Sequence, residues 1–271
     1  MKSAVDKIRW GTERRLEFIE FRLYWEGGVR RGDITEKFGV STPQASADLG
    51  LYQKLAAGNL VYDSSEKRYV STEDFKPIFL DLKADSYLAH LHDASGDRVR
   101  LTDSWMGEVP STALMPVPNR RVKSDVLRAL IRAIREKRSI EILYQSMNKE
   151  NLDKAWRWVS PHSLVNDGAR WHVRAFCHNR RDFRDFLLSR CDATKSFGEA
   201  ESDIDNDVAW NELFEVQLHP NPSLNEVQRR GVMEDYEMEN GNLSIFIKKA
   251  LLFYFEKNLR LDVPDVKGNP A

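Results

Sequence analysis

Long apolar runs and cysteines are what this chain of 271 residues has least of. No stretch approaches the roughly 18 consecutive apolar residues that a membrane-spanning helix needs. The first residues, MKSAVDKIRWGTERR, contain no apolar core of the kind found in signal peptides, so we expect a cytoplasmic protein. Cys177 and Cys191 are the only cysteines, and their spacing fits neither a disulfide scaffold nor a zinc site.

The common motifs of catalysis are also missing. The sequence has no GxSxG elbow, Walker loop, GxGxxG or HExxH. Ser146 and His162 could form a hydrolytic pair, but we find no third group to orient the histidine. We therefore predict a protein that is not an enzyme, without a catalytic site, a metal site or a cofactor.

Charge of one sign is not in excess, because 41 basic residues face 42 acidic ones. The distribution is less even: the segment 120–138 holds eight Lys and Arg against only Asp125 and Glu136. Such a cluster can attract an anionic partner or simply form the solvated face of a helix. The sequence leaves both readings open.

The first 74 residues have the pattern of a winged helix-turn-helix domain. Apolar positions at helical spacing predict a helix over 12–26, a short helix follows in RRGDITEKF, and a third begins at Ser41. Ser41 and Gln44 fit a capping box at the start of that third helix. Two strand-like pieces, NLVYD and KRYVS, follow as a hairpin. A three-helix core with an incidental hairpin is the alternative.

The rest of the chain divides into three further parts. Residues 75–123 are expected to be a linker, helical at first and then extended, and a strongly amphipathic helix follows in SDVLRALIRAIREKR. Short strands in quick succession up to residue 200 predict a small barrel or strongly curved sheet. Residues 208–271 predict a small α+β module. The fold class is therefore α+β with several domains.

Polar side chains interrupt the apolar strands of the central region. They are Tyr144, Ser146, His162, Arg174 and Arg190. Guanidinium groups beside a hydroxyl and an imidazole suit a phosphate or carboxylate ligand. Alternatively, the arginines pair with Asp182, Asp185 or Asp192 at a wet surface.

The segment YQSM…RWVSPHSLVNDGARWHVRAFCHNRRDFRDFLLSR resembles the WYL domain of bacterial transcription regulators. Trp171 stands at the naming tripeptide, with His172 and Val173 in place of Tyr and Leu. Together with YQSM and SPHSL, the pattern is most similar to the BrxR/CapW-like branch associated with phage defence. The winged helix and FYFEKNLRLD, in a WCX-like C-terminal extension, resemble the same branch.

The resemblance implies an Sm-like β-barrel at 124–200, a homodimer, and a repressor that binds an inverted-repeat DNA operator. It also implies a basic pocket for an anionic effector, a nucleotide or nucleic acid. The implied ligand-binding positions are Tyr144, Ser146, His162, Arg174 and Arg190, with Arg184 as a weaker candidate.

A winged helix would place the helix that begins at Ser41 in the major groove, with Thr42, Gln44 and Ser46 near the base edges. Arg30, Arg31, Lys67 and Arg68 are expected to contact phosphates, which position a protein without specifying sequence. A second hypothesis is an accessory module without promoter preference, which would hold nucleic acid on the barrel by stacking on Tyr144, Trp171 or Phe176.

Overall fold

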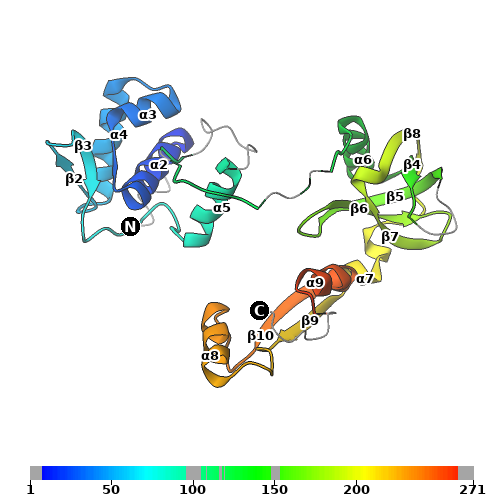
Figure 1. The fold of residues 1–271 in the computed structure, drawn as a ribbon. Helices are drawn as coiled ribbons and strands as arrows, with labels where there is room; N and C mark the ends of the chain where they lie inside the picture. Colours follow the sequence, from blue (N-terminus) through cyan, green and yellow to red (C-terminus); the bar gives the residue numbers. More distant parts are fainter. Residues whose placement is uncertain are drawn as a thin grey trace. The chain divides into compact units, whose positions relative to one another are not determined.

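The chain forms two units, residues 1–116 and 117–271, and each is described by itself. The computed structural model describes residues 8–95, 105–107, 109–115, 118, 120–147 and 153–261 (Figure 1).

The first unit is a winged helix domain. Its helices are α2 (Trp10–Glu26), α3 (Arg31–Phe38) and α4 (Thr42–Leu55). A three-stranded sheet of order β1-β3-β2 forms the wing, from β1 (Gly28–Val29), β2 (Leu60–Asp63) and β3 (Arg68–Ser71). The predicted helices and hairpin are confirmed.

Helical spacing of apolar residues explains how the three helices pack. Leu16, Ile19 and Leu23 form one buried stripe of α2, while Leu49 and Tyr52 are buried from α4. Gly27 ends α2 with φ 69°, a left-handed conformation that glycine adopts without strain. The apolar stripes account for the core of this domain, and the polar faces of α3 and α4 remain outside.

The segment 75–83 is not helical, contrary to the prediction from its sequence. The carboxylate of Glu20, fully buried on α2, accepts hydrogen bonds from the backbone N–H groups of Ile78, Phe79 and Leu80 at 2.8–2.9 Å. In a helix these N–H groups would instead donate to the backbone carbonyls four residues earlier. The helix α5 (Ala84–Ser95) begins only after this segment, and Tyr87 from α5 stacks on Trp25 at 4.5 Å between ring centroids.

The second unit begins with α6 (Ser124–Glu136) and a five-stranded antiparallel sheet of order β7-β6-β5-β4-β8. The strands are β4 (Arg138–Gln145), β5 (Lys154–Asn166), β6 (Trp171–Cys177), β7 (Asp182–Leu187) and β8 (Cys191–Glu199).

The connection between the two edge strands requires this sheet to curl. Only the 3₁₀ turn η2 (Leu188–Arg190) joins β7 to β8. Four peptide steps span at most about 14 Å. The edges of a flat five-stranded sheet would lie about 19 Å apart. The sheet therefore curves as the predicted small barrel does, and Val126, Leu130 and Ala133 of α6 pack into its apolar core.

The basic residues of α6 lie on the side away from this core. Arg128, Arg132 and Arg135 are exposed, and Arg132 pairs with Glu136 at 2.8 Å. Among the helices that the structure describes, none is long and apolar enough to cross a membrane.

The C-terminal module follows η3 (Ile204–Asn206) and α7 (Val208–Asn211). It contains β9 (Leu213–Leu218), α8 (Glu226–Asp235), β10 (Leu243–Lys248), η4 (Lys249–Leu251) and α9 (Leu252–Asn258), with β9 and β10 paired antiparallel. The last predicted helix thus opens with a 3₁₀ turn and ends earlier than expected.

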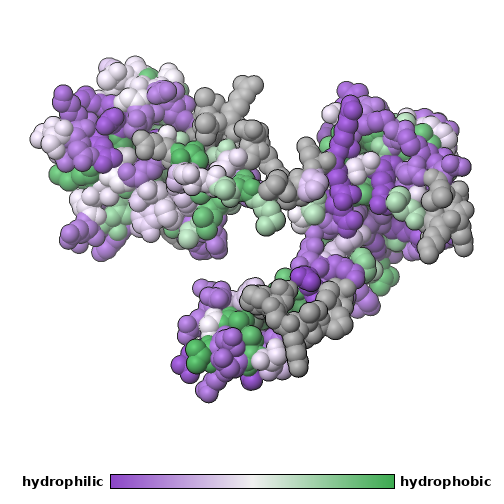
Figure 2. All heavy atoms as spheres, viewed as in Figure 1, coloured by the Kyte–Doolittle hydropathy of each residue, from purple (hydrophilic) through white to green (hydrophobic). Residues whose placement is uncertain are grey.

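This module has little interior of its own. From Val208 to Leu261 no side chain is buried within the chain. Figure 2 shows apolar atoms at the surface of the module, and the exposed apolar residues there include Leu213, Phe246 and Phe253, each more than 60 % exposed. One chain alone therefore leaves much of this module's apolar surface in water.

Candidate functional site

The first turns of α4 project from the winged helix domain. Ala45 is buried, whereas Thr42, Gln44 and Ser46 are exposed. Ser41 caps the helix by accepting a hydrogen bond from the backbone N–H of Gln44 at 3.4 Å. The three predicted base-contacting residues are therefore free to face a groove.

Gln44 does not close a capping box with Ser41, contrary to the sequence-based interpretation. Its Nε2 instead donates to Asp48 Oδ1 at 3.0 Å. Asp48 is 1 % exposed and is held by Arg15, whose Nε lies 2.6 Å from Asp48 Oδ2. The buried ion pair fixes the amide of Gln44, and within the described part of the chain its second N–H and its oxygen have no other side-chain partner. Arg15 and Asp48 lie 33 residues apart, so no local pattern in the sequence pointed to this pair.

The predicted phosphate-contacting residues lie before and after α4 in the sequence. Arg30 and Arg31 are exposed at the start of α3. Lys67 is exposed in the turn between β2 and β3 with φ 53°, and Arg68 is ion-paired with Glu66. Three of the four basic groups are thus exposed on the domain, and Arg68 would have to exchange Glu66 for a phosphate.

The polar residues of the curved sheet fall into two groups on opposite faces. Tyr144 packs edge-on against Phe186 at 5.1 Å, on the core side. Arg174 on β6 pairs with Asp185 on β7. Asp185 precedes Phe186, and neighbouring residues of a strand point to opposite faces, so Arg174 lies on the face away from the core. The single pocket implied by the resemblance is therefore divided.

The first group is a cluster of Tyr144, Arg157 and Arg190. The Tyr144 hydroxyl accepts a hydrogen bond from Leu187 N at 3.3 Å. Burial raises the pKa of Tyr144, and the Leu187 hydrogen bond and the charge of Arg190 oppose the rise. Ser146 follows the end of β4 and is half-buried.

Arg157 was not among the residues singled out from the sequence. Its guanidinium lies 6.0 Å from the centroid of the Tyr144 ring. Arg157 Nε is buried and has no hydrogen-bond partner among the residues that the structure describes. The alternation of side chains along β5 could have identified Arg157. It lies opposite Ile142 on β4, and Ile142 shares a face with Tyr144, two residues further along the same strand.

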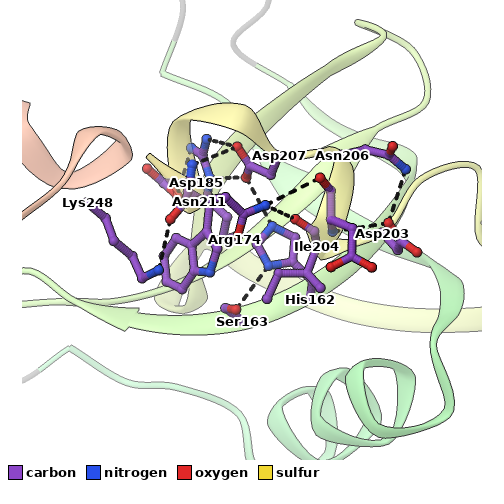
Figure 3. A network of polar contacts seen from close by, with 12 residues as sticks. His162, Ser163, Arg174, Asp185, Asp203, Ile204, Asn206, Asp207, Asn211 and Lys248 are labelled. Atoms are coloured by element: carbon purple, nitrogen blue, oxygen red, sulfur yellow. Dashed lines mark hydrogen bonds and ion pairs between the residues drawn. The ribbon is translucent and has the colours of Figure 1, made fainter. Parts of the chain in front are cut away.

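The second group converges on Asp207 (Figure 3). Arg174 donates from Nε to Asp207 Oδ2 at 2.7 Å and from Nη2 to Oδ1 at 3.0 Å. His162 Nε2 lies 3.1 Å from the same Oδ2, and His162 Nδ1 lies 2.9 Å from Ser163 Oγ. All three side chains of the Asp207 group are more than 90 % buried. A β-bulge between Pro161 and Ser163 aims His162 toward this group.

Burial and charge oppose each other at these residues. Burial alone would raise the pKa of Asp207, but the hydrogen bonds and charge of Arg174 hold it below its ordinary value. Burial lowers the pKa of His162 despite its contact with Asp207. Asp207 is therefore ionised at neutral pH and neutralises Arg174.

Two further contacts join the sheet to α9 of the C-terminal module. Asp185 accepts a hydrogen bond from the Tyr254 hydroxyl at 3.0 Å and pairs with Arg174 at 3.4 Å. Asn258 donates to the backbone oxygen of Asp167, whose carboxylate also binds His172 at 3.0 Å. Arg184, by contrast, is exposed and pairs with Asp182 at 3.1 Å.

A triad of Ser160, His178 and Glu201 lies on the face of Arg174. Ser160 Oγ is 2.9 Å from His178 Nε2, and His178 Nδ1 is 3.0 Å from Glu201 Oε1. Ser160 is only 2 % exposed, and its Oγ also accepts a hydrogen bond from Glu201 N. The hydroxyl is enclosed and cannot reach a substrate as a nucleophile, so the triad links β5 to the segments that follow β6 and β8.

An exposed helix on a winged helix domain, followed by a curved sheet and an α+β module, defines a DNA-binding regulator of several domains. Family models match all three parts. Residues 11–93 match the winged helix-turn-helix domain of the BrxR transcriptional regulator, residues 125–195 the WYL domain, and residues 213–271 the BrxR C-terminal dimerization domain.

Curated relatives extend the similarity over nearly the full chain. The DNA-binding transcriptional repressor CapW of Stenotrophomonas maltophilia is 42 % identical over 99 % of this chain and 90 % of its own length. CapW of Pseudomonas aeruginosa is 42 % identical over 95 % of this chain and 86 % of its own length. The chain therefore belongs to the BrxR/CapW family of DNA-binding transcriptional repressors, and it is a regulator rather than an enzyme.

Among solved structures, the proteasome accessory factor B/C of Arthrobacter aurescens is similar at 17 % identity over 91 % of this chain and 43 % of that one. The TM-score between the two structures is 0.34.

Proposed function

We propose that this protein is a homodimeric repressor of a phage-defence operon, that it binds an inverted-repeat operator, and that an anionic ligand controls it. The observation that carries the proposal is the exposed first turn of α4, with Thr42, Gln44 and Ser46, in a chain that belongs to a family of repressors. Such a repressor acts in the cytoplasm, where the bacterial chromosome lies.

In this proposal α4 lies in the major groove. Gln44 reads a base edge with the amide groups that Asp48 leaves free, and an amide pairs well with adenine. Arg30, Arg31 and Lys67 neutralise phosphates and fix the register of the helix on the duplex.

A second copy of the chain is needed for affinity and for the symmetry of the operator. The surplus of only two positive charges in residues 1–70 is modest for a single DNA-binding domain. The apolar surface of the C-terminal module, including Leu213 and Phe246, is the natural contact between copies. Two half-sites would then lie roughly 34 Å, or a multiple of that distance, apart.

The anion-binding function belongs best to the cluster of Tyr144, Arg157 and Arg190, with Ser146 nearby. A buried guanidinium nitrogen without a partner is costly unless a ligand satisfies it. Guanidinium groups bind phosphate oxygens bidentately, which suits a nucleotide or a nucleic-acid fragment. Arg184 could join this ligand only by leaving Asp182.

Repression can be tested with a reporter gene placed behind the DNA upstream of this protein's own gene. We expect co-expression of the chain to lower reporter output and an unrelated promoter to be unaffected. Equal output with and without the chain would contradict the proposal and favour an accessory nucleic-acid-binding module.

A further inference from the structure

The acidic connector, which we define as residues 199–207, links β8 to α7 and crosses the face of the sheet opposite the core. It carries five carboxylates: Glu199, Glu201, Asp203, Asp205 and Asp207. Among the residues that the structure describes, two of them form ion pairs on this face, Glu201 near the start of the connector and Asp207 at its end.

Each docked carboxylate meets one arginine and one histidine. Glu201 binds His178 at 3.0 Å and pairs with Arg181, both at the turn between β6 and β7. Asp207 binds Arg174 and His162 as described above (Figure 3). The connector thus presents two separated negative charges to two basic sites on one face.

Aromatic rings lie between these basic groups. Phe176 and Phe183 contact each other edge-on at 5.2 Å, the Arg181 guanidinium lies 5.5 Å from the Phe176 centroid, and His162 contacts Phe183 at 5.6 Å. Both phenylalanines are half-buried. Alternating cations and aromatic rings are typical of surfaces that bind single-stranded nucleic acid, where phosphates meet the cations and bases stack on the rings.

The connector is held to this face mainly by charge. Of its residues only Asp207 is buried. An open cleft separates the segment 200–204 from Ile134, Lys137, Pro161 and His162. Glu201, 39 % exposed, can exchange its partners readily, whereas the buried Asp207 gives up Arg174 only to a ligand that supplies an equivalent negative charge.

We propose that the acidic connector is an internal mimic of a polyanion, and that a single-stranded nucleic acid binds this face by displacing Glu201 and Asp207. The inference rests on the proposed control of this repressor by an anionic ligand. It adds a second anion site, on the sheet face opposite the Tyr144 cluster, with single-stranded nucleic acid as the ligand and the connector as its competitor. Asp207 also caps α7 by accepting from Trp210 N at 3.2 Å, so displacement frees the start of the segment that leads into the C-terminal module.

The test removes the charges of the connector and keeps its shape. In Glu201→Gln/Asp207→Asn the connector loses both docked charges, while Asn retains the helix cap. The matched control is Asp205→Asn, whose exposed carboxylate takes no part in the docking contacts of the described residues. Fluorescence anisotropy with a labelled 15-nucleotide oligo-dT probe measures binding to each full-length chain.

We expect the double variant to bind the probe about tenfold more tightly than the wild type, and the control to stay within about twofold of it. An unchanged or weaker affinity of the double variant, or an equal gain in the control, would overturn the proposal. If Asp207→Asn unfolds the chain, the single variant Glu201→Gln provides the test, because Glu201 is 39 % exposed and its loss should be tolerated. An affinity of Glu201→Gln for the probe no tighter than that of Asp205→Asn would also overturn the proposal.

Operator binding by the same preparations separates this inference from the proposed function. Specific duplex binding together with an unchanged oligonucleotide affinity would contradict only the connector proposal. A tighter oligonucleotide affinity without operator preference would contradict the repressor proposal and leave the connector mechanism standing.

Discussion

Single side chains in this protein are positioned by buried ion pairs that join distant parts of the sequence. Asp48 holds both Arg15 and Gln44, and Asp207 holds both Arg174 and His162. A buried charge that loses its partner is strongly destabilising, so each pair ties a functional side chain to the stability of its domain.

Replacing Gln44 with Ala removes the amide but leaves the Arg15–Asp48 pair intact. We expect operator binding to weaken by about 1–3 kcal/mol, with preference lost at one base pair of each half-site. Gln53→Ala, at the exposed far end of α4, is the control. Titration with operator variants measures the affinity and the base preference of both protein variants. An equal loss of affinity for every base substitution would show that Gln44 does not read sequence.

Arg174→Ala leaves Asp207, 2 % exposed, without its main cationic partner. We expect the free energy of unfolding of the second unit to fall by about 3–5 kcal/mol. Arg184→Ala, which breaks only an exposed pair, should change it by less than about 1 kcal/mol. Denaturant titrations of the three chains test this, and equal stability of the two variants would refute the role given to Asp207.

At the scale of elements, helical spacing and strand alternation predicted the helices, the wing and the central strands, because those patterns depend on neighbouring residues. The segment 75–83 was predicted wrongly because its partner, Glu20, lies 58 residues before Ile78. The role of Asp207 likewise depends on distant partners, since Arg174 and His162 lie 33 and 45 residues before it. Arg157 was within reach of the same alternation rule that singled out Tyr144.

Glu20→Ala removes the acceptor of three backbone N–H groups in 78–80 and of the Tyr52 hydroxyl. Each unsatisfied group costs about 1–3 kcal/mol when buried, so we expect the segment to detach from α2. Amide hydrogen exchange at Ile78, Phe79 and Leu80 should quicken, while the exposed control Glu36→Ala leaves it unchanged. Unchanged protection in Glu20→Ala would contradict this account of the segment.

Acidification should destabilise the second unit. Burial lowers the pKa values of His162 and His178 below the ordinary 6.5. At a pH between the lowered pKa of each folded histidine and 6.5, the unfolded chain therefore binds more protons than the folded one. Stability therefore falls as the pH drops through about 6.5. It falls further below pH 3.8, because Asp207 and Asp167 also have lowered pKa values, Asp167 to about 2. Thermal unfolding across this range tests the sign; a midpoint that rises between pH 7.5 and 5.5 would contradict it.

At the scale of the whole molecule, the proposed functions of DNA binding, ligand sensing and dimerisation belong to successive parts of one chain. In this proposal the winged helix presents Gln44 to DNA, the curved sheet carries basic groups on opposite faces, and the C-terminal module leaves apolar surface for a second copy. Asp207 stands at the junction of the last two parts, since it binds Arg174 of the sheet and caps α7. A ligand that favours one arrangement of this junction can change operator affinity, whereas one that binds both arrangements equally cannot.

Sequence-specific DNA binding is measured by titrating the purified chain with the duplex upstream of its own gene. A scrambled duplex of equal length is the control, and both are measured at two salt concentrations. We predict a preference of about a thousandfold or more, as specific binders show. Equal affinity for both duplexes, falling together steeply as salt rises, would contradict the account and show that the protein binds DNA through charge alone.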